Sequence, residues 1–524
     1  MRVMTRRSGL LWLVLCLMAS VGWAQDMPDT VWQRLYADQA WDYINTAVET
    51  RDSGFVLACA TSAADHKPKH GHGGSDIWLV RTDQEGNILW QKNYGGSRDD
   101  RVVTVTRGVG GGYIFAGMTQ SADGDIAAGK YHGGGDAWIV KVDDSGKIQW
   151  QQILGGSGFD CANMIITTPD SCYLMVGITS SKNGDLASNS GKSDVWMVKL
   201  NARGKILWSK TFGGAGQDWG MNAINATDGG FLVTCYTNSK NEVVNGYHGG
   251  GDLWLLHISN DGQLLWQRAF GGPGYDYASS IAATTDGGYV FCGTTQEVTH
   301  SVNATKLQHF WVQKITHSGE PVWQSTFGGE RFHIARTVHA LDNGNFLVTG
   351  QGYVTDTETE QNTVSIDAAL FCVSAQGGLL WHKYLGTPLN DSCNYSLITS
   401  DGSLVCTGSS YPMTNGVPGT ARAGWMFKTT PVEILGVAGG ELDAYKKAIQ
   451  MFPNPTHGDV KVVLPRKLRN AKIVVADNEG ATLNVQIEGE GAERNFTLSA
   501  FAPGVYYVNI ETPAGVIPFR IVLE

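Results

Sequence analysis

Short apolar runs separated by glycine-bearing turns dominate the pattern of the first 430 residues. The runs are rich in β-branched and aromatic residues and have the length of single strands, as in residues 76–83, 87–96, 102–107 and 112–119. Turn signals such as Asp228-Gly229-Gly230 punctuate them. This pattern predicts an all-β chain of short antiparallel strands.

Two columns of tryptophan give the pattern a period near 58 residues. The downstream column follows a glycine-bearing turn, with spacings of 58, 60, 58, 58, 57 and 58 between Trp32, Trp90, Trp150, Trp208, Trp266, Trp323 and Trp381. The upstream column comprises Trp78, Trp138, Trp196, Trp254, Trp311, Ala369 in the sixth slot, and Trp425. Because the chain opens on one half-repeat and closes on the other, its ends complement each other.

Four short strands in each repeat are typical of a propeller blade, and seven copies lie within the usual range. We therefore predict a seven-bladed β-propeller over residues 25–430. Its N- and C-terminal segments, Val31–Ser62 and Ala423–Thr429, are expected to share one blade and so remove an exposed edge. The tryptophans are expected to fill the gaps between blades as buried core residues.

Composition and charge narrow the class of protein. Residues 1–24 have the form of a secretory signal peptide, with Arg2, Arg6 and Arg7 before an apolar run and Ala24 at the cleavage site. Its removal takes the formal charge from −10 to −13, so a nucleic-acid partner is not expected. No later apolar stretch is long enough for a transmembrane helix. We expect a monomer.

Eight cysteines remain after the signal peptide. An exported protein permits disulfides, yet Cys59 and Cys235 occupy columns that other repeats fill with glycine. Use as small buried residues is therefore favoured.

Aspartates also recur in columns. Ten residues after the downstream tryptophans stand Asp42, Asp100, Asp160, Asp218, Asp276, His333 and Asp391, and a second column comprises Asp76, Asp136, Asp194, Asp252 and Asp367. Such regular repetition predicts acceptors that fix turns, since paired catalytic carboxylates need unlike environments.

Two irregular features are candidates for binding. Asp123, Asp125 and Asp185 lie in loops around sharp glycine turns, where carboxylates could hold calcium. In the fifth and sixth repeats, His309 and His333 replace column aspartates, and His300, His317 and His339 lie nearby in sequence. These histidines could bind a ligand or a metal, although drift of the repeat also explains them. The acidic segment 355–361 is expected to be a surface loop.

The last 80 residues have a different texture. After a linker at 431–444, residues 445–524 contain six or seven short alternating strands, which predict a small immunoglobulin-like sandwich. The segment carries a Pro453-Asn454-Pro455 turn with Gly458, a 477–480 turn, and Leu498 through Gly504 and Tyr506. These motifs resemble the C-terminal sorting domain, type A, of proteins exported by the type IX secretion system of Bacteroidetes.

The resemblance implies a route and a partner. The protein would cross the periplasm, engage the type IX machinery through its terminal domain, and be secreted or displayed on the outer membrane. The propeller repeats likewise look like those of secreted Bacteroidetes proteins. The run Val142 to Trp150 is similar to the tryptophan-docking turn of quinoprotein propellers, a likeness of blade packing that implies no quinone.

Two classes of function stay open on this evidence. A non-enzymatic module that presents a site to a protein or glycan is favoured, because no nucleophile triad, HExxH motif or asymmetric carboxylate pair is evident. The alternative is a hydrolase or lyase of glycans or peptides with a site at one end of the propeller channel.

Overall fold

A computed structural model describes most of the propeller and of the terminal module. The described residues are 28–37, 41–62, 72–186, 189–240, 243–296, 308–328, 332–355, 364–387, 389–411, 413–414, 417–418, 422–432, 449–452, 456–465, 468–469, 471–476, 483–489, 493–512 and 515–523. The expected signal peptide, the acidic residues 356–361, His300, Pro453, Asn454, Pro455 and the 477–480 turn lie outside these ranges.

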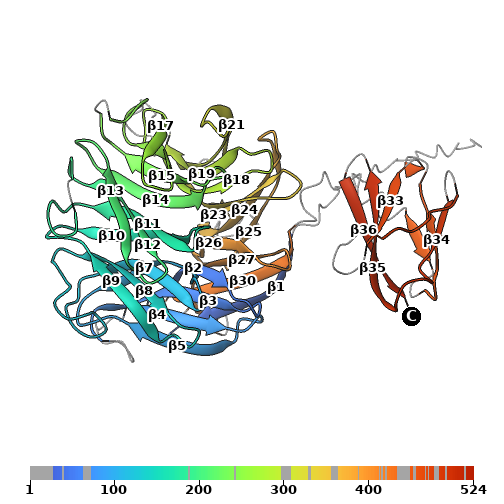
Figure 1. Cartoon of the computed structure of the whole chain (residues 1–524), viewed down its shortest axis with the longest axis horizontal. Coiled ribbons are helices and arrows are strands. Elements are labelled where there is room, and N and C mark those ends of the chain that lie inside the picture. The colour runs from blue at the N-terminus through green and yellow to red at the C-terminus, as the bar shows by residue number, and fades with distance from the viewer. Residues whose placement is uncertain are drawn as a thin grey trace, which may run out of the picture. The chain divides into compact units, whose positions relative to one another are not determined.

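Seven four-stranded antiparallel sheets are formed within residues 28–432, and they are the blades of a propeller (Figure 1). The innermost strands are β2 (Trp41–Glu49), β6 (Asp100–Arg107), β10 (Asp160–Thr167), β14 (Asp218–Asn225), β18 (Tyr277–Ala283), β22 (His333–Ala340) and β26 (Ser392–Ile398). The second strands are β3 (Phe55–Ser62), β7 (Tyr113–Thr119), β11 (Cys172–Thr179), β15 (Phe231–Thr237), β19 (Tyr289–Gln296), β23 (Phe346–Thr355) and β27 (Ser403–Ser410).

The remaining strands complete the blades, which we number one to seven from β2 to β26. Third strands are β4 (Ser75–Thr82), β8 (Asp136–Val142), β12 (Asp194–Asn201), β16 (Asp252–Ile258), β20 (Gln308–Ile315), β24 (Val364–Val373) and β30 (Ala423–Pro431). Outer strands are β5 (Ile88–Tyr94), β9 (Ile148–Leu154), β13 (Ile206–Phe212), β17 (Leu264–Phe270), β21 (Pro321–Phe327), β25 (Leu379–Leu385) and β1 (Thr30–Tyr36). A two-stranded ribbon, β28 (Met413–Thr414) with β29 (Val417–Pro418), precedes β30.

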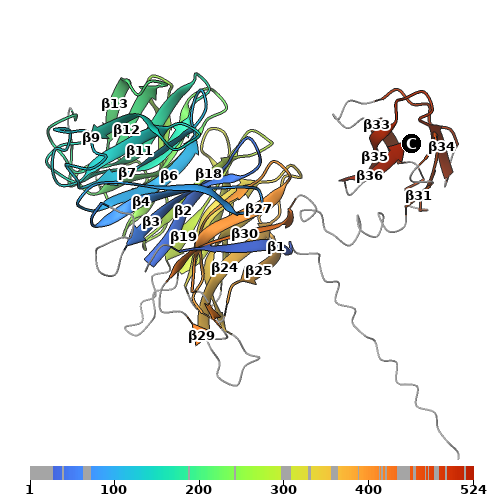
Figure 2. The same cartoon turned by 90° about the horizontal axis from the view of Figure 1, so that it is seen from below.

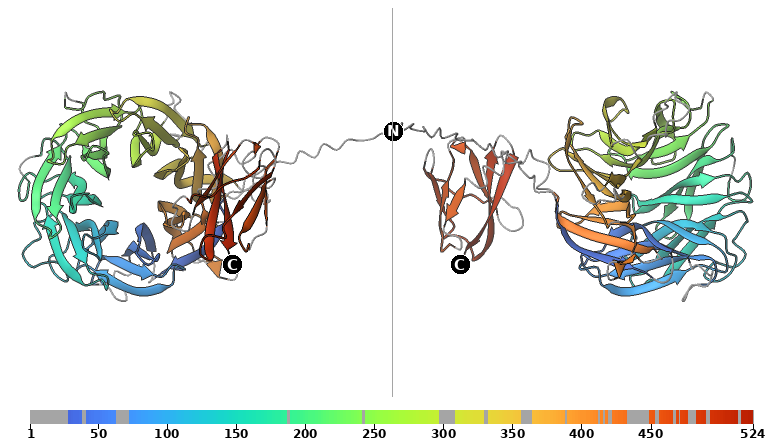
Figure 3. Two further views of the ribbon diagram at one scale, coloured as in Figure 1. Left: turned by 45° about the vertical axis from the view of Figure 1, so that its right-hand side comes forward. Right: turned by 180° about the vertical axis from the view of Figure 1, so that it is seen from behind.

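The blades form a closed ring. Each innermost strand contacts the innermost strand of the next blade, and β26 contacts β2, so the ribbon encircles an axis (Figure 3). Apolar side chains pack between neighbouring blades, as where Val56 and Ile77 of blade one meet Phe115 and Trp138 of blade two. The core is therefore distributed around the ring, one layer per pair of blades.

Blade seven is completed by the N-terminal strand. Strand β1 pairs antiparallel with β30, placing Gln33 opposite Phe427 and Leu35 opposite Trp425 (Figure 2). The expectation that Val31–Ser62 as a whole shares this blade is wrong beyond Tyr36, because β2 and β3 pair with β4 and β5 in blade one. The tryptophan period gives the length of a repeat but not the strand at which a new blade begins.

The two tryptophan columns have different roles. Upstream tryptophans are buried, with Trp138 0% and Trp196 1% exposed. Downstream tryptophans other than the buried Trp381 sit half-buried on the outer strands. There the indole N–H can donate to a turn of the next blade, as from Trp150 to the Ala202 carbonyl at 3.2 Å. The turn glycine Gly204 has φ +78°, and a Cβ there would lie 2.7 Å from the Trp150 ring. The upstream tryptophans and Trp381 are core as expected, while Trp90, Trp150, Trp208 and Trp323 of the downstream column each bond a turn of the next blade.

The cysteines behave as the sequence predicts. All eight described cysteines are free thiols, and seven of them are buried. Among the described residues, no helix has the length and apolarity to cross a membrane.

The C-terminal module is a separate compact unit within residues 438–524. One sheet contains β31 (Gln450–Phe452), β32 (Asp459–Val463) and β34 (Glu493–Thr497), and the other contains β33 (Lys472–Ala476), β35 (Gly504–Thr512) and β36 (Gly515–Leu523). Val462, Leu498, Val508, Ile510 and Ile521 are fully buried in one shared core. The module is the small β-sandwich that the sequence predicts.

Candidate functional site

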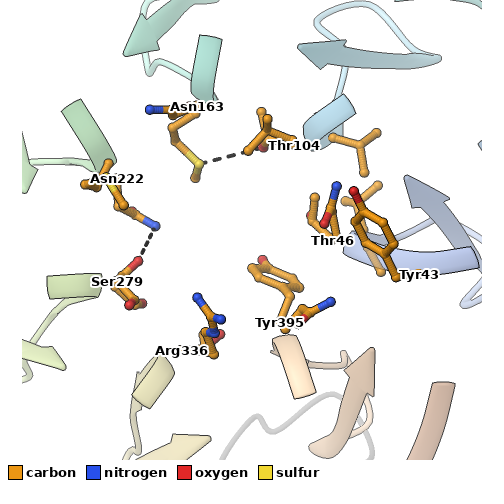
Figure 4. Close-up of a pocket in the computed structure, with 18 of the residues that line it drawn as sticks. Tyr43, Thr46, Thr104, Asn163, Asn222, Ser279, Arg336 and Tyr395 are labelled. Carbon is orange, nitrogen blue, oxygen red and sulfur yellow. Dashed lines mark hydrogen bonds between the residues drawn. The ribbon is translucent and has the colours of Figure 1, made fainter. Parts of the chain in front are cut away.

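The centre of the ring holds a cavity of about 780 Å³. All seven innermost strands contribute to its wall, which is mostly neutral and polar (Figure 4). Its lining includes Tyr43, Asn45, Thr104, Asn163, Met164, Met221, Asn222, Tyr277, Ser279, Arg336, Gln351, Ile366, Ser392, Asn394, Tyr395, Ser409 and Arg422. A cavity of this size could hold a small molecule or the end of a chain.

A β-bulge in each innermost strand shapes this wall. The register shifts once between every innermost strand and its second strand. The extra residues are Asn45, Val103, Asn163, Met221, Ser279, Arg336 and Asn394, and all of them line the cavity. A bulge re-aims a side chain, so this column of the sequence faces the channel.

Asparagines in the bulge column tie neighbouring blades together. Asn45 donates to the Val102 carbonyl at 2.6 Å, Asn163 to the Gly220 carbonyl at 2.8 Å, and Asn394 to the Ile44 carbonyl at 3.1 Å. Each bond runs to the innermost strand of the next blade. The Asn394 bond links blade seven to blade one and so helps to close the ring.

The wall is asymmetric at blades six and seven. Elsewhere the described lining comes from innermost strands alone, whereas here the second and third strands contribute Gln351 and Ile366 in blade six and Ser409 in blade seven, and Arg422 lies immediately before β30. The cavity therefore extends outward on this side. Arg336 and Tyr395 project into the channel from β22 and β26 (Figure 4).

Arg336 and Arg422 are the only ionisable side chains in the described lining apart from the tyrosines. The Nε atom of each arginine is buried and has no hydrogen-bond partner among the described residues. The Arg422 guanidinium lies over the Tyr411 ring, 5.5 Å from its centroid, and the Arg422 carbonyl accepts the Asp42 N–H at 3.0 Å. The channel wall is therefore positively charged on one side.

Two buried carboxyl groups lie near Arg422, those of Asp42 and Asp391. Asp42 and Asp391 are both 0% exposed. Burial raises the pKa of Asp391, while bonds from Ser410 and Thr387 and the charge of Arg422 oppose that rise. Burial also raises the pKa of the Tyr395 phenol, so this hydroxyl stays protonated at neutral pH.

The aspartate columns fix turns, as the sequence predicts. Asp160, for example, accepts the Gly156 N–H at 2.9 Å and the hydroxyls of Thr179 and Ser181 at 2.5 and 2.6 Å. In the second column Asp136 accepts the His132 N–H at 2.6 Å. Burial raises the pKa of Asp76, Asp136, Asp252 and Asp367 to about 6.

The structure does not gather the histidines into one cluster. His333 is 3% exposed, with Nε2 3.1 Å from the Tyr384 hydroxyl, whereas His317 lies 3.8 Å from Asp228 and His339 contacts Ser396 at 2.8 Å. The Nε2 atom of His309 is buried without a hydrogen-bond partner in the described part of the chain. Neither His309 nor His333 lines the channel, and ligand binding by this pair stays a prediction.

The three loop aspartates each accept a backbone N–H. Asp123 accepts from Ser97 at 2.7 Å, Asp125 from Gly95 at 3.3 Å, and Asp185 from Gly155 at 3.1 Å. They belong to equivalent loops of blades two and three, and each loop contacts the turn that leads into its own blade. No group of three or more metal-ligating side chains occurs among the described residues. Calcium binding at these loops stays a prediction.

The sorting-domain motifs meet at one end of the terminal sandwich. The Leu498 N–H donates to the Gly458 carbonyl at 2.7 Å, and Gly458 has φ +139°. The Tyr506 hydroxyl donates to the Ala502 carbonyl at 2.6 Å, and Gly504 pairs with Leu523. The described motif residues thus hold the ends of strands from both sheets.

Comparison with known proteins identifies this terminal module. Residues 450–524 match the family model described as the secretion system C-terminal sorting domain. The chain is thus a propeller protein with a type IX sorting domain, secreted or displayed at the cell surface. No curated protein sequence matches the chain.

Several solved structures resemble the chain at low identity. The WD40 domain of Neurospora crassa Pan2 is 11% identical, with 76% of this chain and 97% of that chain covered and a TM-score of 0.37. A puromycin hydrolase is 12% identical, with coverages of 81% and 58% and a TM-score of 0.41. Synechocystis apocarotenoid oxygenase, as a mutant, is 12% identical, with coverages of 76% and 94% and a TM-score of 0.38.

Sequence reasoning missed Arg336 and Arg422. A signal for Arg336 was nevertheless present, because the residue three positions after each column aspartate is Asn45, Val103, Asn163, Met221, Ser279 or Asn394, and Arg336 alone is charged. Recognising it required knowing that this column bulges into the channel. Arg422 follows an irregular connection and has no such periodic signal.

Proposed function

We propose that this secreted propeller is a non-enzymatic binding module that takes its ligand in the central channel, against blades six and seven. The observation that carries the proposal is the local asymmetry of an otherwise repeated wall. Residues present in every blade serve the blade, as the aspartate and tryptophan columns do, whereas Arg336, Gln351, Ile366 and Arg422 depart from the repeat around a cavity.

The chemistry of the wall favours binding over hydrolysis. In the described lining there is no aspartate, glutamate, histidine, lysine or cysteine. General acid-base catalysis usually draws on these residues, and a serine or threonine nucleophile usually needs one of them beside it as a base. Amides, hydroxyls, aromatic rings and two guanidinium groups instead suit recognition by hydrogen bonds and stacking.

A ligand screen with the full exported protein tests this proposal. The protein would be exposed to panels of sugars, oligosaccharides and short peptides, and binding would be measured by calorimetry. Ser279→Trp would place an indole in the channel beside blade six and should weaken binding, whereas Leu207→Trp adds the same ring to the outer strand of blade three, where Leu207 is 50% exposed, and should leave binding intact.

Two results would contradict the proposal. If Ser279→Trp, folded as judged by its near-UV circular dichroism, binds the ligand as tightly as the native protein, the channel is not the site. If the ligand is recovered chemically altered, in an amount that grows with time and enzyme concentration, the protein is a catalyst.

A further inference from the structure

We propose that the channel site recognises an oxyanion, a carboxylate, sulfate or phosphate group of the ligand, through the guanidinium groups of Arg336 and Arg422. This inference rests on the proposed binding function and names the chemistry of its ligand. It starts from the contrast between these arginines and the buried lysines of the propeller.

Most buried cations elsewhere in the ring have carboxylate partners, and the buried Lys141 has three neutral oxygen partners from Gly111, Val142 and Gln149. On the third strands, Lys199 contacts Asp170 at 2.6 Å, Lys314 contacts Asp286 at 2.5 Å, and Lys428 contacts Asp401 at 2.6 Å. The side chain of Lys199 is 3% exposed. The fold thus gives these enclosed lysines oxygen partners, because burying a charge without any partner is costly.

Arg336 departs from that rule. No hydrogen bond or ion pair joins its guanidinium to any described residue, and its Nε atom is buried without a partner. It stands in the bulge column, where the asparagines of blades one, three and seven use their side chains to bond the next blade. A buried donor that lacks a protein partner calls for a partner from outside the chain.

Arg422 contributes a second charge to the same cavity wall. Its backbone is fixed by the Asp42 N–H at 3.0 Å, and its guanidinium is held over Tyr411. Asp391, the carboxylate whose charge it feels, already accepts bonds from Thr387 and Ser410. The Arg422 Nε therefore remains without a hydrogen-bond partner among the described residues, although a carboxylate is nearby.

The neighbouring groups favour an anion over a cation. Tyr395 offers a hydroxyl that stays protonated, and Ser392 and Ser409 pair with each other at 2.8 Å at the edge of the cavity. Planar guanidinium groups match carboxylate, sulfate and phosphate oxygens, often with two parallel bonds. A positive wall inside a protein of net charge −10 marks a local site for an anion rather than a general affinity.

The test uses three probes on the full protein: glucuronate, inorganic sulfate and inorganic phosphate, with glucose as the neutral probe. Binding is measured by calorimetry at low chloride. At least one oxyanion should bind, and Arg336→Gln and Arg422→Gln should each weaken it tenfold or more. Arg336→Lys keeps the positive charge but loses the planar guanidinium that can form two parallel hydrogen bonds, so it should give an intermediate affinity. The matched control is Arg101→Gln, because Arg101 is 54% exposed and lies outside the channel lining.

Which probe binds identifies the source of the oxyanion. Glucuronate alone indicates a carboxylate ligand, whereas sulfate or phosphate indicates an ester of those acids. A thermal melt without any oxyanion gives an independent readout. A structural role for Arg336 predicts a lower melting temperature for Arg336→Gln, and a ligand-binding role predicts an unchanged or higher one, since an unpaired charge has been removed.

The inference is overturned if no probe binds at 10 mM, a concentration on the order of the weakest specific affinities, or if both glutamine variants bind the probes as the native protein does. Suppose that a neutral ligand binds the arginine variants but not Ser279→Trp. The channel would then be a binding site, and the inference that it recognises an oxyanion would be wrong. If the ligand still binds Ser279→Trp, both the channel site and the oxyanion inference are wrong.

Discussion

At the residue scale, tryptophan is used for two physical purposes in one repeat. Trp196 is 1% exposed and faces Gly177 on the neighbouring strand. Trp208 instead lies half-buried on an outer strand, and its indole donates to the Asn260 carbonyl at 3.0 Å. The two columns have the same spacing but different burial, because the spacing sets the position of a residue in the blade and not the exposed fraction of its side chain.

Trp196→Ala should accordingly destabilise the protein more than Trp208→Ala. Deleting a buried indole leaves a cavity and costs about 3–5 kcal/mol, whereas the half-buried Trp208 loses one hydrogen bond and part of its packing, about 1–2 kcal/mol. Denaturant unfolding followed by circular dichroism measures both. Equal losses would contradict the separate roles of the two columns.

Buried column aspartates give the fold a pH dependence of definite sign. The pKa of Asp136 is raised to about 6 by burial, above its value in an unfolded chain. A raised carboxyl pKa contributes stability that is complete below the unfolded pKa near 4 and is lost as pH rises through 6. The melting temperature should therefore be higher at pH 5 than at pH 7.5.

Asp136→Asn isolates the contribution of one group. The amide oxygen can still accept the His132 N–H, but it carries no charge. At pH 7.5, where Asp136 of the native protein is ionised, the variant should therefore be about 1–3 kcal/mol more stable than the native protein. Asp143→Asn is the control, because Asp143 is only partly buried and hydrogen bonds from Ser145 and Lys147 lower its pKa. A variant with the full pH dependence of the native protein would contradict the assignment to the aspartates.

At the scale of elements, β1 and the bulges mark what a sequence pattern can and cannot predict. The half-repeats at the two ends correctly indicate closure, since the tryptophan phase requires it. The phase does not show that β1 is an outer strand, so the sequence-based prediction places Trp41 to Ser62 in the wrong blade. Arg336 escaped detection because a register shift, which leaves no mark in hydrophobicity, turns its side chain into the channel.

Deleting residues 28–36 should destabilise the ring while leaving blades one to six chemically intact. The deletion uncovers the edge of β30 and removes Tyr36, which is 3% exposed and donates to the Gly86 carbonyl at 2.7 Å. Thermal unfolding should shift downward, and a peptide with the sequence of residues 28–36 should restore it. The contrary result would be an unchanged melting temperature without the peptide.

At the scale of the whole molecule, the propeller and the terminal sorting module are separate units. Each has its own apolar core, and the terminal module matches a sorting domain over residues 450–524. The motif residues of that module could be predicted from sequence because they are fixed by tight turns and strand ends. The channel site could not, because its wall is assembled from seven separated segments.

Removing residues 450–524 should leave a folded propeller in the periplasm, because the propeller buries its core without them. Cell fractionation with an antibody against the propeller measures its location. A full-length protein carrying Leu207→Trp serves as the control and should reach the surface or the medium. Appearance of the truncated protein outside the cell would show that the terminal module is not the address.

The pairing of β1 with β30 also orders events during biosynthesis. Asp29 donates its N–H to the Thr430 hydroxyl across 401 residues of chain, so the first strand to be made must await one of the last. Contacts between such distant segments form slowly. If the expected signal peptide leads the chain through the inner membrane from its N-terminus, the propeller arrives with an unclosed ring, and its final blade can assemble only when residue 431 has emerged. The propeller thus stays incomplete until its last strand has crossed the membrane. The sorting domain follows that strand in the sequence.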